Sequence, residues 1–181
     1  MKKLMLFAAA AVFSLTNVNA QETTFGALAG LSIQSLTVDI GGIGSVSDSE
    51  TGFHIGGFAN IGISDQFSVQ PEVTYAMAGD FSMISVNAIA KYAVSDEFNV
   101  QLGPQIGFAG GDAFDAFDKS TDGDSTSMNL QLAAGVGYDI NENIFVQARY
   151  GFQLNDHFTG DGDFSWKVNT ISLGVGYKFG G

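Results

Sequence analysis

The chain of 181 residues has no cysteine, only two prolines and only seven basic residues. The absence of cysteine excludes disulfide bonds and thiolate metal sites. With so few basic residues the net charge is −12, and such an acidic chain is not expected to bind nucleic acid. A soluble globular domain carries about 25% charged residues, whereas this chain has 14% charged and 45% hydrophobic residues. Something other than a charged surface must therefore keep the folded chain dispersed.

No apolar run reaches the roughly 20 residues that a membrane-spanning helix needs. At the N-terminus, Lys2 and Lys3 precede an apolar run over residues 4–15, and small residues suited to cleavage end at residue 20. These features predict a secretory signal peptide over residues 1–20 rather than a membrane anchor, for which the run is too short. One domain is expected over residues 21–181. Without Lys2 and Lys3 the net charge becomes −12 − 2 = −14.

Apolar and polar residues alternate strictly in several segments. In NIFVQARYGFQLND, residues 143–156, Val146, Tyr150 and Phe152 share one parity, and Gln147 and Arg149 share the other. A β-strand sends successive side chains to opposite faces, so each parity is one face of a sheet. Eight such runs occur, at residues 25–34, 53–63, 67–77, 84–94, 98–108, 128–138, 144–154 and 170–179.

Short and long connections alternate between these runs. The segments Ser64–Gln66, Ser95–Glu97 and Asn141–Asn143 resemble one another and predict one hairpin turn used three times. Between them lie a tight connection at Gly79-Asp80 and long ones at residues 37–52, 110–127 and 155–165. Eight strands of about ten residues with this alternation are typical of a membrane barrel. The expected fold is all-β, an eight-stranded antiparallel up-and-down transmembrane β-barrel, and the protein is expected to be a monomer.

The apolar parity is expected to face lipid. In the alternative, a soluble lipocalin-like barrel, the outer wall would be Gly, Ser, Asn, Gln and Ala, almost without the charges that natural sheet surfaces carry. Glycines on the other parity suit a narrow lumen. Pro71 and Pro104 lie on the apolar parity, where each removes one ladder donor, and β-bulges are the expected accommodation.

Aromatic residues form two expected girdles on the lipid face, separated by the about 25 Å of a hydrocarbon layer. The girdle at the short-turn end comprises Phe67, Phe98, Tyr138, Tyr177 and Phe179, together with Phe25 and Tyr92. The girdle at the long-loop end comprises Phe53, Tyr75, Phe108, Phe152 and Trp166.

Three charged residues, Glu72, Lys91 and Arg149, fall on the lumen parity. Arg149 facing lipid near the middle of the bilayer would cost about 2–4 kcal/mol, whereas inside the barrel it can be paired. The sequence therefore predicts a buried polar network that plugs the lumen.

The closing strand ends in GVGYKF, residues 174–179. With the eight runs over residues 25–179, the chain resembles the small eight-stranded outer-membrane barrels of the OmpA-like and OmpX-like superfamily, and especially the PorT-type outer membrane protein beta-barrel domain proteins. Two glycines follow the terminal aromatic residue, a departure from that pattern. The resemblance implies the outer membrane of a Gram-negative bacterium, with outer-membrane lipid, lipopolysaccharide and the barrel-assembly machinery as partners. It indicates the architecture and says almost nothing of an activity.

Acidic residues gather in the long connections. The segment DKSTDGDSTSMN, residues 118–129, matches a calcium loop in part, with Asp118, Asp122 and Asp124 as candidate ligands. It has Asn129 in place of the closing glutamate, and no flanking helices are expected. A solvated acidic loop that loosely attracts divalent cations is therefore the favoured interpretation, and no cofactor is expected.

Three functions remain open on this sequence. His54 in the lumen and His157 in the last long connection raise the possibility of a lipid-modifying barrel enzyme, but no arrangement of nucleophile, base and acid stands out. A small-solute channel is the second possibility, although eight strands leave no open pore by themselves. The favoured function is a non-enzymatic outer-membrane barrel with a structural or surface-interaction role through acidic outer loops.

Overall fold

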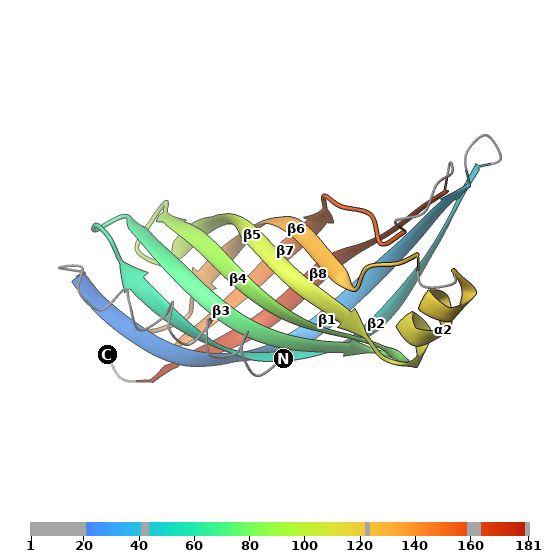
Figure 1. Cartoon of the computed structure of the whole chain (residues 1–181). Coiled ribbons are helices and arrows are strands. Elements are labelled where there is room, and N and C mark those ends of the chain that lie inside the picture. The colour runs from blue at the N-terminus through green and yellow to red at the C-terminus, as the bar shows by residue number, and fades with distance from the viewer. Residues whose placement is uncertain (1–20, 41–43, 122–123, 159–163, 180–181) are drawn as a thin grey trace.

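The structure is a computed structural model that describes residues 21–40, 44–121, 124–158 and 164–179 (Figure 1). The expected signal peptide over residues 1–20 lies outside the described residues, as does Asp122.

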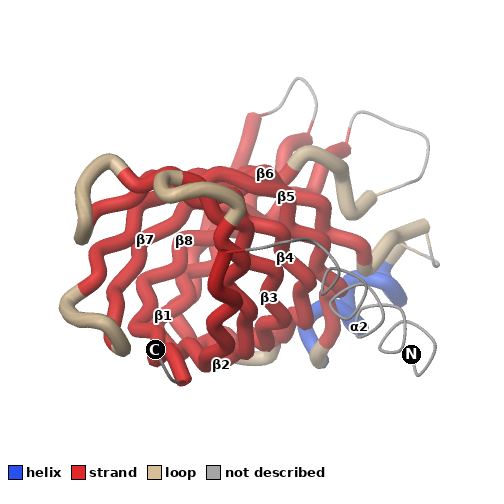
Figure 2. The backbone as a smooth tube through the Cα atoms, turned by 90° about the vertical axis from the view of Figure 1, so that its left-hand side faces the viewer, coloured by secondary structure: helices blue, strands red, loops and turns tan. Residues whose placement is uncertain are grey.

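Eight antiparallel strands close into one barrel, in which each strand pairs with its neighbours in the sequence and β1 pairs with β8 (Figure 2). The strands are β1 Gln21–Ile40, β2 Gly44–Gly62, β3 Phe67–Ala78, β4 Phe81–Ala93, β5 Phe98–Gly110, β6 Met128–Asp139, β7 Ile144–Gln153 and β8 Phe164–Phe179. This confirms the predicted eight-stranded up-and-down barrel. Among the described residues, no helix is both long and apolar enough to cross a membrane.

Burial alternates along the strands in the predicted sense. On β5, Leu102 is 53% exposed and its neighbour Gln101 only 4% exposed, and the same alternation continues around the barrel. The apolar parity forms the outside and the polar parity fills the lumen. A soluble barrel would place these faces the other way, so the lipocalin-like alternative is excluded.

The three short turns share one geometry. In each, a side-chain oxygen accepts a hydrogen bond from the backbone N–H three residues later: Ser64 from Phe67, Ser95 from Phe98, and Asn141 from Ile144. The prediction of a reused hairpin turn is confirmed. At the other end, the Gly79-Asp80 turn depends on the positive φ of 53° at Gly79, which glycine adopts without steric cost.

The two prolines do not produce the expected bulges. The β2–β3 register is the same on both sides of Pro71, as is the β4–β5 register on both sides of Pro104. Each proline instead lies at a gap in one ladder while its other edge stays paired, Pro71 with Ala88 and Pro104 with Leu132. The missing donor therefore costs local pairing without shifting the strands.

The long-loop end is more ordered than the sequence predicts. Residues 37–52 were expected as a loop, but β1 continues to Ile40 and β2 begins at Gly44, and these paired ends project beyond the rest of the barrel beside β8 (Figure 1). A nine-residue helix, α2 (Asp112–Ser120), occupies the connection between β5 and β6, where no helix was expected.

Candidate functional site in the lumen and at the outer rim

A bidentate ion pair crosses the lumen. Arg149 Nη1 and Nη2 donate to the two carboxylate oxygens of Glu72, each at 2.7 Å. The strands β3 and β7 that carry them are not neighbours in the barrel, so the pair spans the lumen between opposite walls. Both side chains are almost completely buried. Two parallel charge-assisted hydrogen bonds are the strongest arrangement open to these groups.

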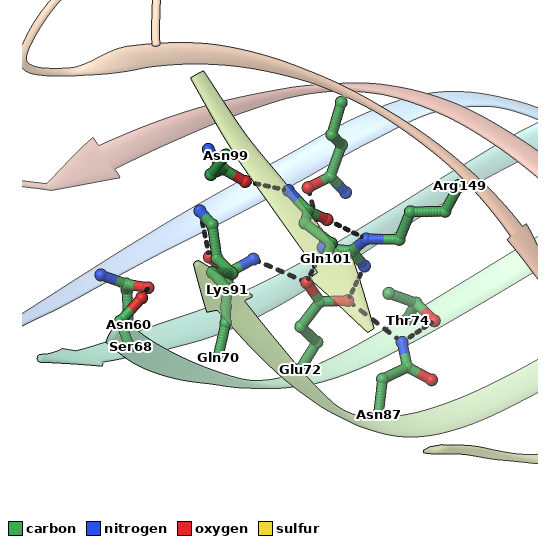
Figure 3. A network of polar contacts seen from close by, with 11 residues as sticks. Asn60, Ser68, Gln70, Glu72, Thr74, Asn87, Lys91, Asn99, Gln101 and Arg149 are labelled. Atoms are coloured by element: carbon green, nitrogen blue, oxygen red, sulfur yellow. Dashed lines mark hydrogen bonds and ion pairs between the residues drawn. The ribbon is translucent and has the colours of Figure 1, made fainter. Parts of the chain in front are cut away.

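Amide side chains extend the ion pair in both directions (Figure 3). Gln70 donates to Glu72 at 2.6 Å and accepts from Lys91 Nζ at 3.2 Å. On the other side Arg149 Nε donates to Gln101, which donates to Asn99. The structure thus brings together all three residues of the predicted lumen network, although Lys91 is joined to Glu72 only through Gln70.

An apolar layer also fills the lumen, which sequence analysis missed. Leu28, Phe58 and Phe145 form a buried cluster, with the two rings edge-to-face at 5.4 Å. Their parity could have revealed them, because all three lie on the polar face of their strands. Beside them, glycine leaves the necessary space: a Cβ at Gly176 would lie 2.0 Å from the ring of Phe145.

Toward the outer end, lumen amides replace backbone pairing. The last β7–β8 backbone pair is Gly151 with Thr170. Beyond it, the N–H of Val168 donates to the side chain of Gln153, and its carbonyl accepts from Gln131 at 3.0 Å. These side chains therefore hold β8 to β6 and β7 beyond the last β7–β8 backbone pair.

A hydrophobic cluster, termed here the outer cap, lies between α2, the outer ends of β5 and β8, and the barrel mouth. Its rings are Phe114 and Phe117 of α2 and Trp166 of β8, and Phe114 stacks on Trp166 at 6.2 Å between ring centroids. Trp166 was expected in the lipid-facing girdle, and this is corrected: it is only 6% exposed. On β8 the even-numbered residues face the lumen, so the ring of Trp166 points inward.

The other expected girdle residues lie on the outer face of the barrel. Phe67, Phe98, Tyr138, Tyr177, Phe179, Phe53, Tyr75 and Phe152 are exposed, and Phe108 is half-buried. In a bilayer these rings are expected near the two ends of the apolar wall, where one edge meets headgroups and water.

His157 is fully buried in the outer cap. Its Nδ1 lies 2.7 Å from the backbone oxygen of Thr126, and its Nε2 lies 3.3 Å from the amide nitrogen of Asn129. A neutral ring with its proton on Nδ1 satisfies both contacts. Burial lowers the pKa of His157 below its ordinary value, although the Thr126 carbonyl and the Asp156 carboxylate partly oppose this.

Asp156 holds the β7–β8 connection in place beside the outer cap. Burial raises its pKa, but hydrogen bonds from Ser165 and from the backbone N–H groups of Trp166 and Phe158 outweigh burial, and the pKa falls below its ordinary value. Its carboxylate thus stays charged and joins the β7–β8 connection to β8. Among the residues that the structure describes, the hydrogen-bond partners of His157 include no nucleophile, and the Nδ1 of His54, which is buried in the lumen, has no hydrogen-bond partner.

The candidate calcium ligands are not gathered into a site in the part of the chain that the structure describes. Asp118 lies in α2, where its Oδ1 accepts a hydrogen bond from Ser125, and Asp124 is exposed beyond the helix. No group of three or more His, Asp or Glu side chains placed to hold a metal occurs among the described residues.

The family model described as "Outer membrane protein beta-barrel domain" matches residues 5–179. The chain belongs to this family. It is therefore a protein of the outer membrane of a Gram-negative bacterium, as predicted. No curated protein sequence matches the chain significantly.

Solved structures of small outer-membrane proteins share the fold. Neisserial surface protein A is 18% identical, with 88% of this chain and 100% of that chain covered and a TM-score of 0.50. Ail, the attachment invasion locus protein of Yersinia pestis, is 19% identical with the same coverage and a TM-score of 0.53. Ail in complex with the heparin analogue sucrose octasulfate matches at 18% identity, the same coverage and a TM-score of 0.51.

Proposed function

We propose that this outer-membrane barrel is a non-enzymatic, monomeric surface protein, which presents an acidic strand beyond its outer rim to partners outside the cell. The observation that carries this proposal is the outward extension of β1, β2 and β8. The segment of β2 over residues 44–52, termed here the free edge, pairs with β1 on one side, while the β2–β3 ladder begins only at Phe53.

The free edge has the chemistry of a docking strand. Gly52 and Glu50 lie against the end of β3 and the turn at Gly79, but over residues 44–49 the backbone groups on the side away from β1 can pair with an added strand, as in β-augmentation. The described side chains of the free edge are exposed except at Gly52, and Asp48 and Glu50 give it negative charge. Opposite charge on a partner steers encounter and suppresses wrong partners. The partner chemistry that fits best is therefore an extended, lysine-rich segment.

The filled lumen argues against the rival function of a small-solute channel. The Glu72–Arg149 pair spans the lumen, and the outer cap lies over its outer end. Between them lies a cavity of about 40 Å³, which suffices for about one water molecule. Single-channel recordings in planar bilayers are expected to show no conductance above the lipid background, and steady openings would favour the channel.

The second rival is a lipid-modifying enzyme. Catalysis by His157 would need a nucleophile in contact with its ring, yet the ring contacts a backbone carbonyl and an amide. Lipid A mass spectra from strains carrying the wild type and His157→Ala are expected to be identical. A mass difference that depends on His157 would overturn the non-enzymatic proposal.

Ail supplies a contrast through its recorded ligand. Ail has been solved with sucrose octasulfate, a polyanion, whereas this chain carries a net charge of −12. We expect no binding of polysulfated sugars here, and we propose instead that the acidic loops loosely attract divalent cations. The lipid-facing wall would contact outer-membrane lipid and lipopolysaccharide, and the last strand would be read by the barrel-assembly machinery.

The experiment measures binding of a fluorescent lysine-rich peptide to the barrel in lipid nanodiscs. Replacing residues 35–49 with a two-residue turn, which joins the paired residues Gln34 and Glu50 and removes Asp48, is expected to abolish binding, while the shift in gel migration on boiling is retained. The control exchanges Asp65, which is exposed in a short turn at the opposite end, for Asn and leaves binding unchanged. Equal binding by the shortened and the full-length protein would contradict the proposal.

A further inference from the structure

A cavity of about 220 Å³ lies at the short-turn end of the lumen, the end that faces the periplasm in barrels of this architecture. It is remote from the free edge and from the outer cap. Two lysines on different strands, Lys91 of β4 and Lys178 of β8, line it together with Asn60, Ser68 and Asn99. This basic pair is notable in a chain with only seven basic residues.

Lys91 is a buried cation with an incomplete set of partners. The residue is 6% exposed, and its ammonium has one hydrogen bond to the described residues, which is to Gln70 Oε1 at 3.2 Å. The same nitrogen lies 5.0 Å from the centroid of the Phe145 ring. In the described part of the chain no carboxylate lies within 4 Å of it. An ammonium group has three donors, so Lys91 retains capacity for a ligand.

The two nearby carboxylates, Glu72 and Asp139, each form an ion pair with another cation and not with Lys91. The nearest buried acid in its network, Glu72, already forms a bidentate pair with Arg149. Asp139 is paired with Lys178 at 2.7 Å. Buried charges are normally paired, and here the unpaired one borders a cavity that an ion can enter.

The geometry points to an anion-binding site at this mouth, with Lys91 as its central ligand and a small monovalent oxyanion as its occupant. Lys178, whose Nζ lies 5.8 Å from the same Phe145 ring, also lines the cavity, but it is paired with Asp139, which lines it too, so Lys91 is the cation that remains to bind an anion. The hydroxyl of Ser68 and the amides of Asn60 and Asn99 supply uncharged polar groups around the space. Carboxylate and phosphate share the chemistry that such a site recognises.

Acidic residues at the rim of the cavity limit the negative charge that a ligand can carry. Asp65, Asp96 and Glu97 lie in exposed turns around the mouth. Their repulsion is screened at physiological ionic strength, whereas the attraction to the buried ammonium is screened much less. A monoanion such as acetate is therefore favoured over a multiply charged anion.

The test uses the full mature barrel in detergent micelles, with ¹³C-labelled lysine and ¹⁵N-labelled backbone, titrated separately with acetate and with inorganic phosphate. The Lys91 Cε resonance and the amide resonances of Asn99 and Lys178 are expected to shift saturably. Acetate is expected to bind more tightly than phosphate at pH 7.5, where phosphate is mostly dianionic. Shifts that stay linear up to high concentration would overturn the proposal.

Matched variants locate the site. Lys91→Gln is expected to weaken acetate binding about tenfold, the loss of one charge-assisted contact. Lys119→Gln removes an equal charge from exposed α2 at the opposite end and leaves the affinity unchanged. Asp96→Asn tightens binding about twofold by removing a screened repulsion. Equal weakening by the two lysine variants would show that binding depends on the overall charge of the protein and would overturn the proposed site.

Two measurements keep the test independent of the folding of Lys91→Gln. The Lys91 Cε titration of the wild type needs no substitution. Inositol hexakisphosphate, which is too large and too highly charged for the cavity, is expected to leave that resonance unchanged. If it shifts the resonance as acetate does, the ligand is not entering the cavity, and the proposal fails.

Discussion

The barrel wall and the outer cap bury opposite kinds of side chain. Within the barrel, charged and amide groups such as Glu72 and Arg149 are buried and most of the large apolar side chains face outward, apart from the apolar layer around Phe145. In the outer cap, Phe114 and Trp166 are buried while Asp112 and Asp115 of α2 face water. The same chain thus follows two rules, because the solvent changes from acyl chains to water at the outer rim. Whether polar or apolar side chains are buried therefore depends on whether lipid or water surrounds that part of the molecule.

The largest expected effect comes from breaking the lumen ion pair. Arg149→Ala leaves the Glu72 carboxylate buried without a counter-charge, which should lower the free energy of unfolding by about 3–5 kcal/mol. Urea titration in detergent micelles, followed by the gel shift on boiling, measures this. The double variant Glu72→Leu/Arg149→Met should recover most of the loss. A fall below 1 kcal/mol for the single variant would show that the pair does not hold the barrel together.

A smaller effect is expected from charging the lipid face. Leu102→Arg places a cation near the middle of the wall and should cost about 2–4 kcal/mol of folding free energy in bilayers. The matched control is Val46→Arg on the free edge, which is 70% exposed and beyond the predicted bilayer, where the cost should be near zero. Equal costs at both positions would mean that the two regions meet the same solvent.

The ion pair at the short-turn mouth of the lumen should contribute less again. Lys178 and Asp139 are in contact at 2.7 Å but remain partly exposed, and such pairs contribute about 0–1 kcal/mol because water competes for both charges. A double-mutant cycle with Lys178→Gln and Asp139→Asn, followed by urea unfolding, should return a coupling in that range. A coupling as large as that of Glu72 and Arg149 would erase the distinction between lumen and mouth.

The smallest effect concerns acid and the outer cap. Burial lowers the pKa of His157, so its contribution to stability is complete above the unfolded value of about 6.5. That contribution is lost as pH falls through the lower folded pKa. The fluorescence of Trp166, the only tryptophan, should shift to the red on acidification below pH 6.5, while the barrel stays folded. In His157→Gln the fluorescence should depend much less on pH. An unaltered pH profile in that variant would show that another group causes the shift.

The barrel could be predicted from the sequence because each strand in the bilayer has one face toward lipid and the other toward the polar lumen. That contrast fixes the parity of Leu102 and Gln101, and it places Glu72 and Arg149 inside. The free edge escaped prediction because both of its faces meet water, so Asp48, Ser49 and Glu50 show no alternation. Trp166 was misplaced because its distance from the strand end was considered and its parity was not.

Other features depend on contacts that no local pattern carries. Helix α2 exists because Phe114 and Phe117 pack on Trp166, which is about fifty residues away in the chain. The hydrogen bonds that Val168 donates to the Gln153 side chain and accepts from the Gln131 side chain depend on where the β7–β8 ladder ends. Parity alone showed that the partner of Arg149 must be another lumen residue. That this partner is Glu72 depends on how the closed barrel places β3 opposite β7, which the sequence does not show.

Two leucines test the central claim most directly without any substitution. Leu102 is predicted to face acyl chains, and Leu28 lies in the lumen at 3% exposure. In nanodiscs containing methyl-labelled protein, nuclear Overhauser effects from lipid acyl protons should appear at the Leu102 methyl groups and be absent at those of Leu28. Strong transfer to Leu28 with none to Leu102 would contradict the outward-facing apolar wall.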